Sequence, residues 1–292
     1  MAIYDCFMFW NETELLYMRL DILYNYVDKF IICESKESHS KNVIKEEFVF
    51  IQNKQMYQKF MDKIIFIPVD KLPFEGDFTL DKNNKDSWNN WHNENWQRKH
   101  LVTGIVDAKE DDIIAISDLD EIYDPLVLST VHSNIDRYNI IGINHKLFYY
   151  YVNNLKEQLW QGSFFLKKKS ITSPDIIQTI RNRRTSLPCY INGGWHYSWM
   201  GGEDRVSDKF QVIAEHDIIK QYNNKEHIKN VLQNNTDLFN RNGYLGSSKL
   251  INIHDNNNAP EKIEEYIKMF PIIFYREKIY TSEDLSSHKI LS

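Results

Sequence analysis

The chain of 292 residues contains only three cysteines, Cys6, Cys33 and Cys189, and no CxxC pair. Disulfide frameworks and zinc-thiolate sites need more cysteines or closer spacing, so the sequence favours neither of them. We therefore expect a reduced, cytoplasmic environment for this chain.

Long apolar runs and a surplus of positive charge are also missing. No segment approaches the roughly 18–20 consecutive apolar residues that a membrane span needs. The first ten residues carry Asp5 and no basic cluster, so they are not typical of a secretory leader. Lysine and arginine total 35 against 41 for aspartate and glutamate, a net charge of −6, which argues against coating nucleic acid. We predict neither a membrane span nor a nucleic-acid partner.

The pattern of apolar segments indicates an α/β fold. Short apolar segments predict strands at residues 3–9, 29–33, 64–69 and 113–116, and the segments between them predict helices at 11–26, 48–61 and 91–106. Strands and helices in alternation predict a Rossmann-like, mostly parallel sheet flanked by helices, in one domain over residues 1–292. The second half adds predicted strands at 140–151 and 163–167 and predicted helices at 204–214, 225–239 and 261–270.

The most informative stretch is Ser117-Asp118-Leu119-Asp120-Glu121, directly after an apolar strand. Alternate side chains of an extended chain share one side, so Asp118 and Asp120 are predicted to point the same way at the ligand-binding edge. Two such carboxylates repel each other unless a cation lies between them, and Mg²⁺ or Mn²⁺ suits oxygen ligands and phosphate. The pattern favours transfer from a phosphate-activated donor, and an acidic cap of the strand stays open as the alternative. A dehalogenase-type phosphatase is disfavoured because its D-x-D normally follows the first strand.

Several motifs recur in one order along the chain. They are IYDCF at 3–7, NE at 11–12, VDKF at 27–30, Trp91 with Glu94, Gln97 and Arg98, DDII at 111–114, SDLDEI at 117–122 and GGWHYSW at 193–199. Together they make the chain, over about residues 3–270, resemble glycosyltransferase family 17, which includes the bisecting β-1,4-mannosyl-glycoprotein β-1,4-N-acetylglucosaminyltransferase. The resemblance implies a GT-A-type fold, a UDP-sugar donor such as UDP-GlcNAc, a glycan acceptor, inversion at the anomeric carbon, and Mn²⁺ or Mg²⁺. It also implies a donor-binding half at about 1–125 and an acceptor and catalytic half at about 126–292.

The resemblance assigns the metal to the carboxylate cluster. Asp120 is implied to bind the metal directly, and Asp118 to reach the ribose or, through water, the metal. An imidazole is a common further ligand, for which His196 in the Gly193-Gly194 segment is the first choice and His254 the second. A structural histidine is the alternative for both.

An inverting transfer needs a base that deprotonates the acceptor hydroxyl from a separate loop. Asp204 is the candidate base and Glu203 its neighbour, although both could instead complement a helix N-terminus. Lys209, one turn later, is a candidate for contact with phosphate, or a solvated lysine.

The remaining candidates are assigned to the donor. Arg98 could contact the diphosphate or form a helix pair with Glu94, and Glu34 could contact the base or ribose. Trp195, with Trp88 and Trp199, could stack on a sugar or uracil or be buried in the core. The basic run at 181–184 could steer an anionic donor or be a solvated helix end.

Two other functions stay open at this point. One is a non-catalytic relative that binds glycans or nucleotide sugars, which the retained Asp118 and Asp120 disfavour. The other is a metal-dependent phosphotransferase or nucleotidyltransferase, which would release a different product.

Overall fold

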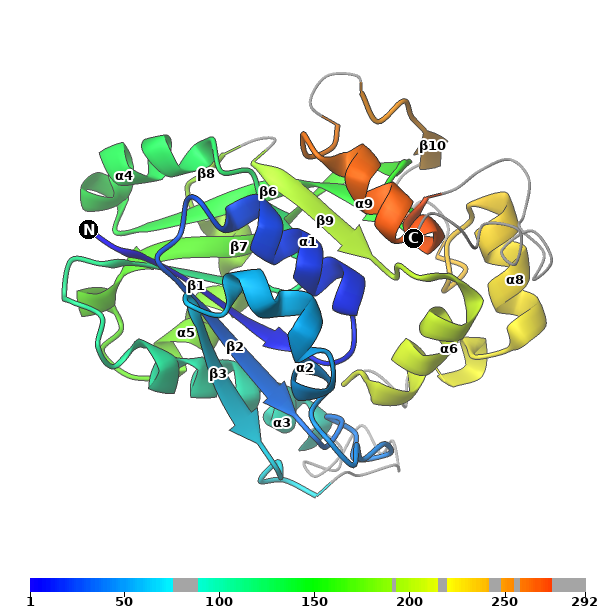
Figure 1. Cartoon of the computed structure of the whole chain (residues 1–292), viewed down its shortest axis with the longest axis horizontal. Coiled ribbons are helices and arrows are strands. Elements are labelled where there is room, and N and C mark those ends of the chain that lie inside the picture. Colours follow the sequence, from blue (N-terminus) through cyan, green and yellow to red (C-terminus); the bar gives the residue numbers. More distant parts are fainter. Residues whose placement is uncertain (76–88, 191–192, 215–219, 242–247, 255–257, 275–292) are drawn as a thin grey trace.

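The computed structural model describes residues 1–75, 89–190, 193–214, 220–241, 248–254 and 258–274 (Figure 1). The strands are β1 (Ile3–Phe9), β2 (Lys29–Ser35), β3 (Ile64–Val69), β4 (Ile113–Asp118), β5 (Glu121–Tyr123), β6 (Ile140–Tyr149), β7 (Asn154–Lys167), β8 (Cys189–Tyr190), β9 (Gly194–Ser198) and β10 (Ser248–Leu250). The α-helices are α1 (Thr13–Leu23), α2 (Val49–Gln52), α3 (Asn89–His100), α4 (Val127–Tyr138), α5 (Asp175–Asn182), α6 (Gly202–Val212), α8 (Lys225–Asn234) and α9 (Ile263–Met269). Short 3₁₀ helices are η1 (Lys54–Phe60), η3 (Leu101–Ile105), η4 (Lys168–Ser170), η5 (Arg184–Ser186), η6 (Lys220–Tyr222) and η7 (Pro271–Ile273).

One sheet runs through the molecule in the order β3-β2-β1-β4-β7-β6-β9-β5. The first four strands in this order are parallel, as the alternation of elements predicts. Strand β7 lies antiparallel to both β4 and β6, so beyond β4 the sheet is mixed. The predicted α/β sheet flanked by helices is confirmed. Its parallel pairs are those of β1 to β4 and, in the second half, those of β6 with β8 and β9.

The alternation of β1 divides its side chains between two buried faces. Ile3 and Phe7 pack in a core with α1 and α2, whereas Tyr4 and Cys6 pack in a second core with η3 and α5. In Figure 1, α1 and α2 lie over the near face of the parallel strands and α3 and α5 lie behind them. A parallel strand that is covered on both faces has a continuous apolar sequence. These strands could therefore be predicted from the sequence.

Some predicted elements have different bounds. The helix predicted at 48–61 is α2 followed by η1, and the helix predicted at 91–106 is α3 followed by η3. The strand predicted at 163–167 is the end of the longer β7, whose first half carries exposed Glu157 and Gln158. That half is held in the sheet by pairing with β6, which a search for apolar runs does not detect.

A third cluster of apolar side chains attaches α6 and α8 to the end of the sheet. Val206 and Phe210 of α6 pack with Tyr149 and Trp199. This packing orients α6 so that its last turn faces the carboxyl ends of β1 and β4. No helix in the described residues is both long and apolar enough to cross a membrane.

Cys6 and Cys33 should resist thiol reagents in the native protein. Both side chains are fully buried, and burial raises the pKa of the Cys6 thiol and raises that of Cys33 to about 12. The native protein is exposed briefly to iodoacetamide at pH 8 and analysed by mass spectrometry, and we expect neither cysteine to be alkylated. In guanidinium chloride, which unfolds the protein, we expect both to be alkylated. Rapid native labelling of either peptide would contradict the packing of β1 and β2.

Candidate active site

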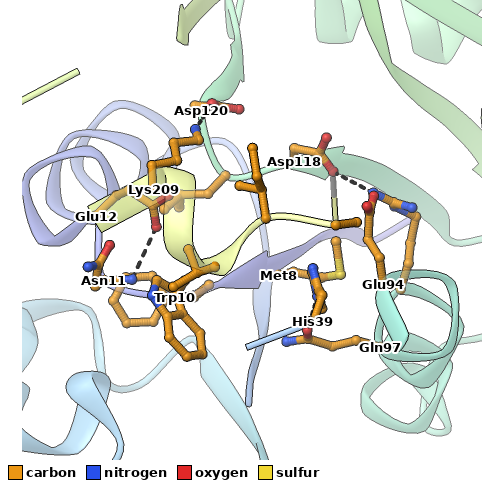
Figure 2. A pocket seen from close by; sticks show the side chains of 16 residues that line it. Met8, Trp10, Asn11, Glu12, His39, Glu94, Gln97, Asp118, Asp120 and Lys209 are labelled. Carbon is orange, nitrogen blue, oxygen red and sulfur yellow. Dashed lines mark hydrogen bonds and ion pairs between the residues drawn. The ribbon is translucent and has the colours of Figure 1, made fainter. Parts of the chain in front are cut away.

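A cavity opens at the carboxyl ends of β1 and β4, the edge at which the sequence predicts a ligand (Figure 2). Its walls come from the end of β1, the loop after β2, helix α3, the turn after β4 and the end of α6: Met8, Phe9, Trp10, Asn11, Glu12, His39, Glu94, Gln97, Arg98, Asp118, Leu119, Asp120, Lys209, Val212, Ile213 and Ala214. Its volume of about 250 Å³ is below the roughly 300–1,000 Å³ of most small-molecule sites, so a large ligand would extend beyond it.

Asp120 lies between two basic side chains. Its Oδ1 is 3.4 Å from Nε2 of His196, and its Oδ2 is 3.4 Å from Nζ of Lys209. Burial opposes the ionisation of Asp120, but His196 and Lys209 outweigh it and lower the pKa of Asp120 to about 2. The carboxylate is therefore ionised at neutral pH, and the structure brings together three residues that the sequence assigns to one site.

Asp118 is bound by two arginines. Its Oδ1 accepts a hydrogen bond from Arg98 (3.1 Å) and its Oδ2 accepts one from Arg181 (2.5 Å). Burial opposes ionisation here too, but Arg181 and Arg98 lower the pKa of Asp118. Arg181 also holds the buried carboxylate of Glu121 at 2.9 Å and 3.0 Å. The charge of Asp118 is therefore neutralised within the protein.

The two carboxylates of the D-x-D sequence do not point the same way, contrary to the prediction from strand alternation. Strand β4 ends at Asp118, and residues 119 and 120 form a turn before β5. Figure 2 shows Asp118 beside α3 and Asp120 beside Lys209, on different sides of the cavity. The alternation rule fails because it applies only while the chain stays extended.

A buried arginine holds this turn in place. Arg19 of α1 is fully buried and donates two hydrogen bonds to the carboxylate of Asp5, at 2.6 Å and 2.8 Å. Its Nη1 donates to the backbone carbonyls of Asp118, Leu119 and Glu121 at 3.0–3.2 Å. The conformation of residues 118–121 is thus set by α1 and β1 as well as by its own sequence.

Helix α6 contributes Lys209 but not the predicted base. Glu203 and Asp204 lie in its exposed first turn and do not line the cavity. Lys209 lies in the last turn, where Asp120 and Glu12 outweigh the effect of burial and raise the pKa of Lys209. Of the α6 candidates, Lys209 therefore faces the cavity, and the role of Asp204 as a base stays a prediction.

The structure places Glu34 outside the cavity, contrary to the predicted contact with the nucleotide. Its side chain is fully buried and accepts hydrogen bonds from Lys45 (2.6 Å) and from the backbone N–H groups of Val49 (2.7 Å) and Phe50 (3.0 Å). Glu34 thus satisfies the first N–H groups of α2, which have no partner within that helix.

The predicted tryptophans are core residues. Trp195 and Trp199 are 4% and 7% exposed and belong to two different apolar clusters, so neither ring is available for stacking on a ligand. Gly194 serves the packing of β9 against β5 rather than approach to a ligand, because a Cβ there would lie 2.3 Å from the carbonyl oxygen of Ile122. Trp88 lies outside the described residues.

The side chains fit a divalent metal through two ligands. His254 pairs with Glu264 (3.3 Å), is largely exposed and does not line the cavity, so it is not placed with Asp120. The described residues contain no group of three or more His, Cys, Asp or Glu side chains that could hold a metal ion. Asp120 and His196 offer an oxygen and a nitrogen ligand 3.4 Å apart, and Nδ1 of His196 is buried without a partner in the described part of the chain. Two protein ligands suit a cation that shares phosphate oxygens with its substrate.

Sequence reasoning missed several cavity residues. Trp10 and Glu12 line the cavity directly after β1, although Glu12 reads as the start of a helix. His39 lines it from the loop after β2, with Nε2 2.8 Å from Oε1 of Gln97. Arg181 reads as a solvated residue of a basic run but is buried. Trp10 and Glu12 could have been found from their position in the sequence, because they directly follow a parallel strand at its ligand-binding end.

The sequence profile of glycosyltransferase family 17 matches residues 1–242. The chain belongs to glycosyltransferase family 17. Among curated proteins, none matches it. Family membership supports a glycosyltransferase activity, with a nucleotide-sugar donor and a glycan acceptor.

Solved structures resemble the chain loosely. The Staphylococcus aureus protein TarS, residues 1–349, is 11% identical, with a TM-score of 0.39, and the match covers 93% of this chain and 81% of that one. A 4-diphosphocytidyl-2C-methyl-D-erythritol synthase from Anaerococcus prevotii is 8% identical, with a TM-score of 0.37 and coverage of 65% and 86%. A UDP-glucose pyrophosphorylase complexed with UDP-glucose is 10% identical, with a TM-score of 0.35 and coverage of 76% and 100%.

Proposed function

We propose that this family 17 glycosyltransferase is a metal-dependent, inverting enzyme of the GT-A type. It transfers a sugar, with GlcNAc the first candidate, from UDP to a hydroxyl of a glycan. The observation that carries the proposal is that Asp120, which lines the cavity at the carboxyl ends of β1 and β4 together with Lys209, contacts both Lys209 and His196 of β9. A carboxylate, an imidazole and an ammonium group at this edge suit a metal-bound diphosphate.

Asp120 and His196 are the proposed metal ligands. Bound Mn²⁺ or Mg²⁺ would neutralise the charge that develops on the diphosphate leaving group. Asp118 is not a proposed ligand, because Arg98 and Arg181 occupy both of its oxygens.

The other cavity residues have proposed roles toward the donor. Lys209 offers an ammonium group to the diphosphate, and its contact with Asp120 keeps it charged. Arg98 faces the same cavity but is already bonded to Glu94 at 2.5 Å and Asp118 at 3.1 Å, so it orients Asp118. Trp10 is half-buried and exposes part of its indole to the cavity, where a planar base could stack.

Release of nucleotide in the absence of an acceptor tests this function. We expect UDP to be released from UDP-GlcNAc faster than from UDP-glucose, UDP-galactose or GDP-mannose, in the presence of Mn²⁺ and not in the presence of EDTA. Chromatography of the products identifies the nucleotide. Release of UMP with GlcNAc 1-phosphate would indicate transfer of the nucleotidyl group, and donor binding without turnover would indicate a non-catalytic relative. Either result contradicts the proposal.

A further inference from the structure

A second cavity adjoins the first on the side of α5 and β7. Its volume is about 660 Å³, and it shares Glu94, Arg98 and Asp118 with the first cavity. A transferase has to bring two substrates together at one reaction centre, and the two cavities meet at these three side chains. On the basis of the proposed function, we propose that the second cavity binds one neutral sugar ring of the acceptor glycan.

Two helices and a strand form this cavity. Trp91, Asn95 and Arg98 have the spacing of one face of α3, and the first two of them line only this cavity. On α5, Gln178 and Asn182 form a second face one turn apart. The site is therefore built on packed secondary structure rather than on loops.

The fixed charges around the cavity balance. Arg98, Arg181 and Arg184 line the cavity together with the carboxylates of Glu94 and Asp118. The third carboxylate is that of Glu121, which is fully buried behind the wall and pairs with Arg181. A phosphorylated or carboxylated ligand would find no surplus of positive charge there. The balance therefore favours an uncharged ligand.

The remaining polar groups suit sugar hydroxyls. Asn95, Gln178 and Asn182 are amides, each able to donate and accept, as a hydroxyl does. Gln178 accepts a hydrogen bond from Arg98 (2.9 Å) and donates one to Asn182 (2.8 Å), and an amide group has a second donor and a second acceptor site beyond such bonds. Nε of Arg184 is buried and has no partner among the described residues. Trp91 is half-buried and lines the cavity, so its indole offers a surface on which the apolar face of a sugar can pack.

Trp160 connects this cavity to the proposed reaction centre at Asp120. Its Nε1 donates to Oε1 of Glu121 at 2.6 Å, and its ring lies 4.9 Å from that of His196, which contacts Asp120. Arg184 packs its guanidinium 5.3 Å from the Trp160 ring. With its indole engaged in this way, Trp160 forms the floor, and Trp91 is the stacking residue.

Binding of methyl glycosides tests the site directly. Saturation-transfer NMR and fluorescence titration would use the methyl glycosides of mannose, glucose, galactose and N-acetylglucosamine, with UDP and Mn²⁺ present to occupy the first cavity. We expect at least one glycoside to bind, and Trp91→Ala to weaken its binding by about tenfold or more, the size of a modest hot-spot loss. Asn182→Trp, at an exposed position on the rim, should also block binding while leaving the core intact.

The matched control is Trp10→Ala in the first cavity, which should weaken binding of UDP and leave glycoside binding unchanged. The inference is overturned if no glycoside binds, if UDP displaces the glycoside, or if folded Trp91→Ala and Asn182→Trp bind glycosides as the parent does. Turnover of UDP-GlcNAc, measured in parallel, separates the two proposals. Glycoside binding without donor turnover would contradict the transfer alone, and turnover with unaltered glycoside binding in both variants would contradict this site alone.

Discussion

Asp120→Asn should lower the rate of sugar transfer by on the order of 10²–10³-fold, the usual loss when one group that stabilises developing charge is removed. The substitution keeps the shape of the side chain and removes its charge. In the parent, that charge is held between His196 and Lys209 and persists at neutral pH, because the pKa of Asp120 is lowered to about 2. The measurement is turnover of UDP-GlcNAc as a function of Mn²⁺ concentration, with the variant requiring more metal than the parent.

Asp208→Asn is the matched control, because Asp208 is an exposed carboxylate on α6 beside Lys209 and does not line the cavity. It should leave turnover and the response to Mn²⁺ within about twofold of the parent, as surface substitutions usually do. A second comparison is Asp118→Asn, which removes the partner of two buried arginines and should lower thermal stability more than Asp120→Asn does. If Asp120→Asn retained parental turnover and metal response, the proposed metal site would be wrong.

Arg19→Ala should lower the free energy of unfolding by about 3–5 kcal/mol, the usual result of breaking a buried ion pair from one side. It leaves the fully buried carboxylate of Asp5 without its counter-ion. It also removes the donor to the carbonyl oxygens of Asp118, Leu119 and Glu121. The free energy of unfolding of a typical protein is about 5–15 kcal/mol, so a loss of this size could leave much of the variant unfolded. Urea unfolding followed by circular dichroism measures it.

Arg137→Ala, at an exposed position on α4, is the control and should cost no more than about 0.5 kcal/mol. The double variant Asp5→Asn with Arg19→Met removes both charges and should recover part of the loss, since an unpaired buried charge is the main cost. A small effect of Arg19→Ala, or no recovery in the double variant, would contradict the role assigned to this pair. In Arg19→Lys, which keeps the charge but not the fork of donors, we expect a weaker response to Mn²⁺ if Arg19 positions the turn at 118–121.

The sequence contained a sign that Arg19 is buried in an ion pair, which an analysis of apolar periodicity alone overlooks. Leu15, Arg19 and Leu23 lie one turn apart on the buried face of α1, and Asp5 interrupts the apolar β1. A charged residue on each of two buried faces predicts a pair, because neither charge is stable there alone. The carbonyl partners at residues 118–121 had no such signal, since they are about 100 positions away along the chain.

For the aromatic residues too, the sequence shows which residues are present but not what they contact. The composition is 14% aromatic, and the sequence left open whether the tryptophans of the glycine-containing segment at 193–199 stack on a ligand or are buried in the core. Residues 194–198 of that segment form the buried β9, and among the described residues the tryptophans that line the two cavities are Trp10, Trp91 and Trp160. Whether a tryptophan is exposed depends on which elements pack over it, and local composition does not carry that information.

What the sequence by itself determined is the family, the α/β class, the parallel strands β1 to β4, and a carboxylate cluster at their ligand-binding edge. Each of these follows from local patterns, since a strand buried on both faces is apolar throughout and family motifs are contiguous. Only the tertiary structure decided that Asp118 forms ion pairs with two arginines and that Asp120 contacts His196 and Lys209. Side-chain partners come from segments far apart in the chain, and a single turn after β4 sends neighbouring carboxylates to different partners.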